Sequence, residues 1–86
     1  MSVNIYVGNL AFSVNNAELE ELFTEHGTVS SAQVIMDRET GRSRGFGFVE
    51  MADANAARAA IEALDGAEVD GRRLKVNEAR ERQGRR

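Results

Sequence analysis

The sequence predicts an α+β fold in which two helices cover one face of a four-stranded antiparallel sheet. Three observations lead to this prediction. Four segments of the 86-residue chain carry the alternating apolar residues that are typical of strands. Two other segments carry apolar residues three and four positions apart, which is typical of amphipathic helices. Glycines and polar stretches lie between these segments, where turns and loops are expected.

The first strand and the first helix are predicted from the N-terminal part of the chain. Apolar residues at positions 3, 5 and 7 alternate with others, and Gly8-Asn9 end this half-buried strand. Asn15 is expected to cap a helix, with Glu18 at the position that completes a capping box. The apolar stripe of this helix comprises Leu19, Leu22 and Phe23.

Residues 29–36 form the second predicted strand, and residues 37–43 form a polar, glycine-bearing loop after it. Side chains alternate between the two faces along a strand, which assigns each residue to a face. The side chains expected to point inward are those of Ala32, Val34 and Met36, and those expected on the opposite face are Gln33 and Ile35.

Residues 44–51, Arg-Gly-Phe-Gly-Phe-Val-Glu-Met, form the third predicted strand. By alternation, one face bears Arg44, Phe46, Phe48 and Glu50, and the other bears Gly45, Gly47, Val49 and Met51. Two aromatic rings beside an arginine suit the stacking of unpaired bases and pairing with phosphate. The alternative, in which the rings are core residues, would expose Val49 and Met51 instead.

The second helix and the last strand are predicted from the C-terminal part. Asp53 can cap the helix and Gly66 can end it. Residues 67–71 are expected to form a turn or short hairpin, and residues 73–79 the last strand. The buried stripe of the helix comprises Ala57, Ala60, Ile61 and Leu64; in the strand, Leu74 and Val76 point inward and Lys75 and Asn77 outward.

The predicted element order is therefore βαββαβ. With right-handed crossovers, this order gives the split βαβ, ferredoxin-like fold, which leaves one face of the sheet open. Residues 1–79 are expected to form this single domain. Residues 80–86 are polar and basic, and we expect this tail to be disordered or to become ordered only on binding.

The composition argues against several classes of protein. The chain has no cysteine and one histidine, so disulfides, thiolate metal sites and multi-histidine metal sites are excluded. No nucleophile accompanies a general base, and we predict neither an enzyme nor a cofactor nor a small-molecule substrate. No apolar run approaches the roughly 20 residues of a membrane span, and no secretory signal is evident. The expected state is a cytoplasmic monomer without membrane contact.

The net charge of −3 is unusual for a protein that binds nucleic acid, but the charge is unevenly distributed. Residues 1–36 carry four acidic and no basic residues, whereas residues 37–86 carry eleven basic and ten acidic ones. The four acids lie on the first predicted helix, away from the aromatic strand. The low pI of about 5.1 still indicates weak non-specific affinity.

Two motifs resemble the signatures of the RNA recognition motif family. Residues 44–51 match K/R-G-F/Y-G/A-F-V-x-F/Y except at Met51, which falls on the inward face. Residues 5–10, Ile-Tyr-Val-Gly-Asn-Leu, match the family's second, six-residue signature on the first strand. The resemblance covers residues 3–79; the chain looks like the small bacterial single-domain RNA-binding proteins and is also similar to the front half of glycine-rich RNA-binding proteins, whose glycine-rich tail is absent here. It implies that the two signature strands are adjacent at the centre of the sheet.

The resemblance also implies roles for individual residues. Tyr6 and Phe48 would each stack a base, and Phe46 would pack against the sugars between them. Outward polar residues could contact the rest of the bound RNA; the alternative for each is a solvated surface residue without a ligand. Phosphate contacts are expected from Arg44 and Lys75, loop contacts from Arg38 and Arg42, and base-edge contacts from Asn4, Gln33 and Asn77.

The leading hypothesis is a module that binds about 2–4 nucleotides of single-stranded RNA through stacking and phosphate contacts. By resemblance, its role would be RNA chaperoning or post-transcriptional regulation. A second hypothesis is a protein-interaction domain that uses the acidic first helix, with Glu18, Glu20, Glu21 and Glu25. A third is single-stranded DNA binding, because stacking alone does not distinguish the sugars.

Overall fold

The computed structural model describes residues 2–69 and 71–79, so the predicted tail at 80–86 lies outside the described residues. The elements follow the predicted order, with one additional hairpin before the last strand. They are β1 (Val3–Gly8), α1 (Asn16–Thr24), β2 (Val29–Met36), β3 (Ser43–Met51), α2 (Ala54–Leu64), β4 (Glu68–Val69), β5 (Arg72–Arg73) and β6 (Lys75–Glu78).

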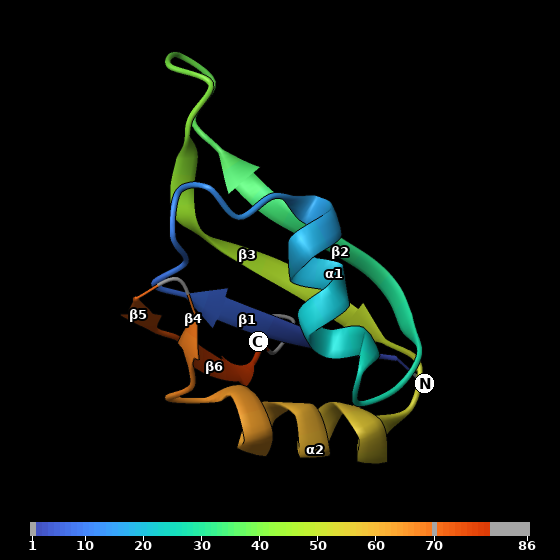
Figure 1. Cartoon of the computed structure of the whole chain (residues 1–86). Helices are drawn as coiled ribbons and strands as arrows, with labels where there is room; N and C mark the ends of the chain where they lie inside the picture. Colours follow the sequence, from blue (N-terminus) through green and yellow to red (C-terminus); the bar gives the residue numbers. More distant parts are fainter. Residues whose placement is uncertain (1, 70, 80–86) are drawn as a thin grey trace, which may run out of the picture.

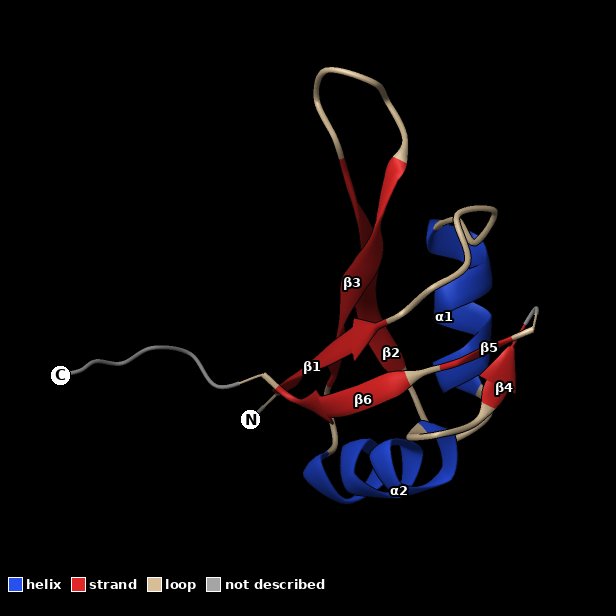
Figure 2. Ribbon diagram, turned by 90° about the vertical axis from the view of Figure 1, so that its left-hand side faces the viewer, coloured by secondary structure: helices blue, strands red, loops and turns tan. Residues whose placement is uncertain are grey.

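Four strands form one antiparallel sheet in the order β2-β3-β1-β6, while β4 and β5 form a separate two-stranded sheet. Figures 1 and 2 show α1 and α2 on the same side of the four-stranded sheet. Within the described residues, no helix lies on the opposite face. The predicted ferredoxin-like fold, with the two signature strands β1 and β3 paired at its centre, is confirmed.

The core lies between the sheet and the helices. The sheet contributes four residues whose side chains are at most 1% exposed: Ile5, Val7, Val49 and Val76. The helices and the loop after β1 complete the core with Leu10, Val14, Leu19, Phe23, Ala57, Ala60 and Leu64. The small side chains of the two α2 alanines let that helix approach the sheet closely. This packing fixes which face of each strand is buried, and therefore which residues remain on the other face.

Polar side chains at the helix ends join the two layers. The capping box of α1 is present as predicted, because the Asn15 side chain accepts from the Glu18 N–H and Glu18 accepts in return from the Asn15 N–H. Asn16 Oδ1 then accepts from the Val34 N–H of β2 at 2.8 Å. Asp65, the C-cap of α2, accepts from the Val76 N–H of edge strand β6 at 3.2 Å.

The predicted alternation of β2 is wrong at its end. Met36 was expected inward but is 50% exposed, because the pairing of β2 with β3 shifts between Val34, opposite Gly47, and Met36, opposite Ser43. Gly45, with a φ of 86°, lies in this irregular stretch of β3. A left-handed residue of this kind is typical of a β-bulge, which interrupts strict alternation.

The predicted last strand is also divided. Arg72 and Arg73 pair with β4, and pairing with β1 begins only at Lys75. Between them, the Leu74 N–H donates to the Ala67 carbonyl and the Leu74 carbonyl accepts from the Gly66 N–H. The chain therefore changes partner at Leu74. The short hairpin expected near residues 67–71 is present, with β5 extending it.

Candidate nucleic-acid interface

Four outward residues form a continuous row across the open face of the sheet. Gln33 of β2 lies opposite Phe48 of β3, Phe48 lies opposite Tyr6 of β1, and Tyr6 lies opposite Asn77 of β6. Two aromatic rings thus occupy the central strands, and a side-chain amide lies at each edge. Directly paired residues on antiparallel strands have Cβ atoms about 4.5–5.5 Å apart, so neighbours in this row are within reach of one another.

Tyr6, Phe46 and Phe48 form a compact cluster, called here the aromatic platform. The centroid of the Tyr6 ring lies 5.9 Å from that of Phe46 and 5.9 Å from that of Phe48, and the two phenylalanine centroids are 6.0 Å apart. The rings meet in tilted or edge-to-face geometry, the arrangement that aromatic quadrupoles favour. Phe48 remains 39% exposed although it belongs to this cluster.

A glycine on β1 provides space for the platform. A Cβ atom added at Gly8 would lie 2.5 Å from Tyr6 Oη and 2.9 Å from Tyr6 Cε2. Gly8 also lies opposite Phe46 on one side and Lys75 on the other. The absence of a side chain at Gly8 therefore lets the Tyr6 ring occupy the space between Phe46 and Lys75.

The remaining outward residues surround the platform unevenly. Lys75 is exposed beside Gly8, at one end of the platform. Asn4 is half-buried at the other end, opposite Glu50, which Ser31 also faces. A carboxylate on this face opposes phosphate locally, so the cationic end near Lys75 is the more favourable one for a nucleic-acid backbone.

Arg44 is exposed as predicted, but Gly45 separates it from Phe46, so regular alternation does not fix its direction. Arg38 and Arg42 are exposed on the β2–β3 loop, which projects beyond the sheet (Figures 1 and 2). The Asp37 N–H donates to the Arg42 carbonyl at 2.7 Å, and Asp37 Oδ1 accepts from the Glu39 N–H. These bonds order the loop internally, and no contact is seen between its two arginines and the platform among the described residues.

The comparisons with known proteins identify the family. A family model of the RNA recognition motif matches residues 5–75. The chain belongs to the RNA recognition motif family. It is 59% identical over 78 residues to RNA-binding protein CP31B of Arabidopsis thaliana chloroplasts, covering 91% of this chain and 27% of that protein. It is 58% identical over 81 residues to RbpE of Nostoc sp. (strain PCC 7120), covering 94% and 82%. It therefore spans about a quarter of the plant protein and most of RbpE.

Solved structures agree with this assignment. The crystal structure of RNA Binding Protein PG1 superposes with a TM-score of 0.89 at 58% identity, covering 95% of this chain and 99% of that one. The structure of the Rna15 RRM with bound RNA (GU) superposes with a TM-score of 0.80 at 26% identity, covering 88% and 81%. The second of these is a member of the same fold that holds RNA.

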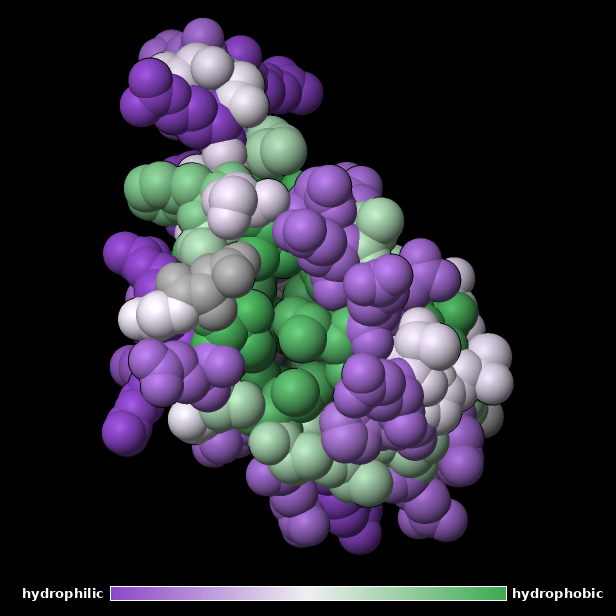
Figure 3. Space-filling model, in the orientation of Figure 1, coloured by the Kyte–Doolittle hydropathy of each residue, from purple (hydrophilic) through white to green (hydrophobic). Residues whose placement is uncertain are grey.

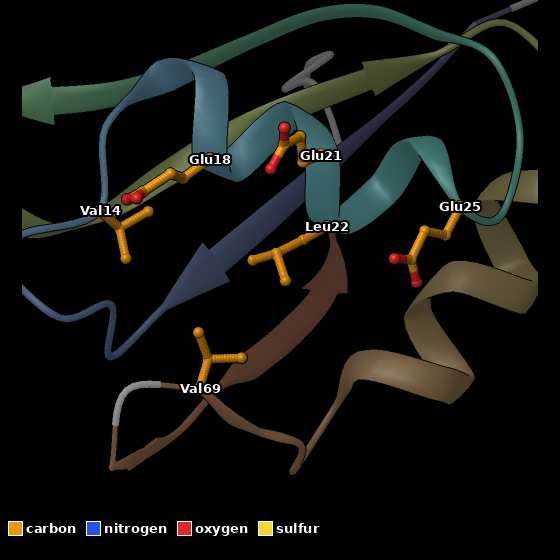
Figure 4. Close-up of a pocket in the computed structure, with 6 residues that line it drawn as sticks. All are labelled: Val14, Glu18, Glu21, Leu22, Glu25 and Val69. Carbon is orange, nitrogen blue, oxygen red and sulfur yellow. The ribbon is translucent and has the colours of Figure 1, made fainter.

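The opposite side of this RRM carries a different kind of surface. Figure 3 shows hydrophobic residues gathered there, with hydrophilic residues around them. A groove of about 250 Å³ is lined by Val14, Glu18, Glu21, Leu22, Glu25 and Val69 (Figure 4). Three carboxylates, two from α1 and one from its C-cap residue Glu25, thus border an apolar floor. No helix within residues 2–69 and 71–79 is long and apolar enough to cross a membrane.

Sequence reasoning identified the platform and the acidic helix but missed two residues that lie outside the helices and the four-stranded sheet. Val69, from the β4–β5 hairpin, completes the apolar floor of the groove. Phe12, in the loop after β1, is 67% exposed and lies near Arg72. The available signal for Phe12 was an aromatic residue two positions after the six-residue signature, in the segment expected to be a loop.

Proposed function

We propose that this RRM binds single-stranded RNA on the open face of its sheet. The observation that carries the proposal is the row from Gln33 through Phe48 and Tyr6 to Asn77. The half-buried Tyr6 and the exposed Phe48 provide ring surfaces on the two central strands, and amide groups at both edges provide donors and acceptors for base edges. The names of the relatives, which include an RNA-binding protein and a ribonucleoprotein, support the same function.

In this proposal, Tyr6 and Phe48 each stack one base and Phe46 packs against the sugars between them. Each stacked base contributes about 1–3 kcal/mol. Lys75 and Arg44 contact phosphates. The loop arginines Arg38 and Arg42 contact the RNA only when it extends past the end of the sheet. Asn4, at the far end beside Glu50, contacts a base edge rather than a phosphate.

The bound segment would be about 2–4 nucleotides, and affinity for a single domain of this kind would be on the order of micromolar. Residues 1–79 would form the RNA-binding domain, and the protein would act as a monomer without catalytic activity. Its role would be post-transcriptional regulation or RNA chaperoning. A stacking platform tolerates many sequences, because every base has an aromatic face. Such tolerance suits a protein that binds many transcripts.

The test is fluorescence anisotropy with labelled random-sequence single-stranded RNA at low and moderate salt. Phe46→Ala combined with Phe48→Ala should reduce affinity at least tenfold at both salts, because stacking does not depend on counterions. Leu22→Ala is the matched control, since it removes a half-buried apolar side chain from the helical side. Circular dichroism verifies that all proteins fold. Equal binding by wild type and the double variant contradicts the proposal.

Single-stranded DNA is the alternative ligand for the same platform. Discrimination against DNA requires a contact to the 2′-hydroxyl group. The amide groups of Gln33 and Asn77 can donate or accept such a bond. Parallel titrations with RNA and DNA of matched sequence distinguish the two ligands, and tighter binding of DNA would reassign the function.

The acidic groove supports a second candidate function, the binding of a basic protein segment. Its apolar floor of Val14, Leu22 and Val69 would take one apolar side chain, and Glu21 and Glu25 would attract flanking lysines or arginines. Charge reversal by Glu21→Lys should abolish capture of such a partner, and nuclease treatment should not. RNA affinity that is unchanged in the same variant would separate this function from the first.

A further inference from the structure

The most exposed large apolar side chain among the described residues lies outside the sheet. Phe12, in the loop between β1 and α1, exposes 67% of its surface, compared with 39% for Phe48 of the platform. The guanidinium carbon of Arg72 lies 5.6 Å from the centre of the Phe12 ring, within the range of a cation–π contact. The ring therefore has one defined partner and a large open surface.

The backbone around Phe12 is held from two directions. Asn9, with a left-handed φ of 60°, donates from Nδ2 to the Arg73 carbonyl at 2.6 Å. The Leu10 N–H donates to the Gly45 carbonyl of β3 at 2.8 Å, and the Leu10 side chain is buried. Arg72 Nη1 also approaches the Leu10 carbonyl at 3.5 Å. Asn9 and Leu10, which precede Phe12 by three and two positions, thus connect the loop by hydrogen bonds to the β4–β5 hairpin and to the sheet.

Phe12 lies beside Gly45, the residue that precedes Phe46 of the aromatic platform. A Cβ atom added at Gly45 would lie 3.7 Å from Phe12 Cε1, and Gly45 directly precedes Phe46. Lys75 lies at one end of the platform, opposite Gly8. Figure 1 shows the β1–α1 loop and the β4–β5 hairpin together where β1 leaves the sheet. An RNA strand that passes Phe46 and continues beyond the end of the sheet would approach the loop that carries Phe12.

We propose that Phe12 and Arg72 form a second stacking site that takes one further base of the bound RNA. The base stacks on the open surface of the ring, while the guanidinium of Arg72 holds the ring in place and adds positive charge beside the backbone. The packing of the core does not require this ring, since most of its surface is in solvent. The inference rests on the proposed RNA binding and extends the contacted segment beyond the sheet.

This site should act only on RNA that is longer than the platform. We would measure anisotropy with labelled random-sequence RNAs of three and of eight nucleotides. Phe12→Ala should weaken binding of the eight-nucleotide RNA by about 5- to 150-fold, the range expected for one lost base stack. It should leave binding of the three-nucleotide RNA unchanged. Phe12→Tyr should retain the wild-type affinity for both.

Arg72 is a positioning residue in this proposal, so its removal needs a matched control for charge. Arg72→Ala should weaken binding of the eight-nucleotide RNA more than Arg58→Ala does. Both variants lose one exposed guanidinium, but Arg58 lies on α2, on the helical side. Equal losses in the two variants would mean that Arg72 contributes net charge only and would overturn its part in the site.

A direct optical readout is available because the chain has no tryptophan. Phe12→Trp introduces a single one at the proposed site. Its fluorescence should be quenched when the eight-nucleotide RNA is added, and far less with the three-nucleotide RNA. Stacking against a base causes such quenching, whereas a purely structural role for the ring would leave the signal unchanged.

The platform variant separates failure of this site from failure of the function. Suppose that Phe12→Ala binds both RNAs like wild type, while Phe46→Ala with Phe48→Ala loses both. The second site is then wrong and the proposed function stands. If the wild-type protein binds neither RNA, both proposals are wrong. Selective loss of the longer RNA in Phe12→Ala, together with tryptophan quenching, establishes the site.

Discussion

The two faces of the four-stranded sheet are built from neighbouring residues of the same strands, yet they do opposite things. On β1, Ile5 and Val7 are fully buried beneath the helices, while Tyr6 between them lies in the platform. On β3, Val49 is buried and the adjacent Phe48 is exposed. A slip of one residue would exchange the two sets, at the cost of the whole core. Packing on the covered face therefore determines the spacing of the rings on the open face.

Charge separates the open face from the helical side in the same way. The groove along α1 is bordered by Glu18, Glu21 and Glu25, whereas Lys75 lies beside the platform. A net charge of −3 is thus compatible with a local cationic surface. The difference shows that the distribution of charge, and not its sum, decides which side a nucleic-acid backbone can approach.

The largest expected effect comes from truncating two neighbouring residues of β1, one on each face of the sheet. Ile5→Ala should lower the free energy of unfolding by about 2–5 kcal/mol, because it leaves a cavity in the core. RNA affinity of the folded fraction should not change. The neighbouring Tyr6→Ala should do the reverse, with weak binding and nearly normal stability. Urea denaturation and anisotropy measure the two quantities, and matching phenotypes for the pair would contradict the division of labour.

A glycine on the covered face should give the next largest effect. A Cβ atom at Gly47 would lie 2.5 Å from the Gln33 carbonyl oxygen and 3.1 Å from Leu19 Cδ2. Gly47→Ala should therefore lower stability by about 1–3 kcal/mol through overpacking, because backbone atoms of β2 must move. A shift in the urea midpoint measures the loss. No shift would mean that β2 and α1 do not pack on β3 as closely as described.

Local patterns in the sequence predicted most of the fold. The capping box at Asn15 and Glu18 involves residues three apart, and the alternation in β1 and β3 involves adjacent residues. Such features can be predicted from a short stretch of sequence, because all the residues that form them lie within that stretch. The alternation within two short segments placed Tyr6, Phe46 and Phe48 on outward faces, whereas the pairing of the two strands was implied by the resemblance to the family.

The features that were missed depend on contacts between distant segments. Met36 is exposed because the pairing of β2 and β3 shifts near Gly45, whose carbonyl accepts from Leu10, 35 positions away in the chain. Arg72 lies near Phe12 because it belongs to the β4–β5 hairpin, and the Leu74 backbone that follows this hairpin pairs with Gly66 and Ala67 after α2. No window of neighbouring residues contains both partners of such a contact.

A glycine on the open face should affect binding and spare stability. Gly8→Ala places a methyl group where the Tyr6 ring lies, and the ring, as a side chain, can move away. We expect RNA affinity to fall by up to the value of one base stack, about 1–3 kcal/mol, with little change in the urea midpoint. A double-mutant cycle with Tyr6→Ala checks the cause. Gly8→Ala should have no further effect once the ring is absent.

The smallest expected effect sharpens the comparison of charge. Lys75→Ala removes a cation beside the platform, and Arg58→Ala removes one from α2 on the helical side. For single strands, the logarithm of the binding constant falls with the logarithm of salt concentration by about 0.7 for each phosphate contact. Lys75→Ala should therefore make this slope shallower by about 0.7, and Arg58→Ala should leave it unchanged. Because the two variants have the same net charge, equal slopes would show that RNA responds to the total charge of the protein and not to the sheet face. A difference confined to Lys75 would place the RNA backbone at the end of the platform where Phe46 and Gly8 lie.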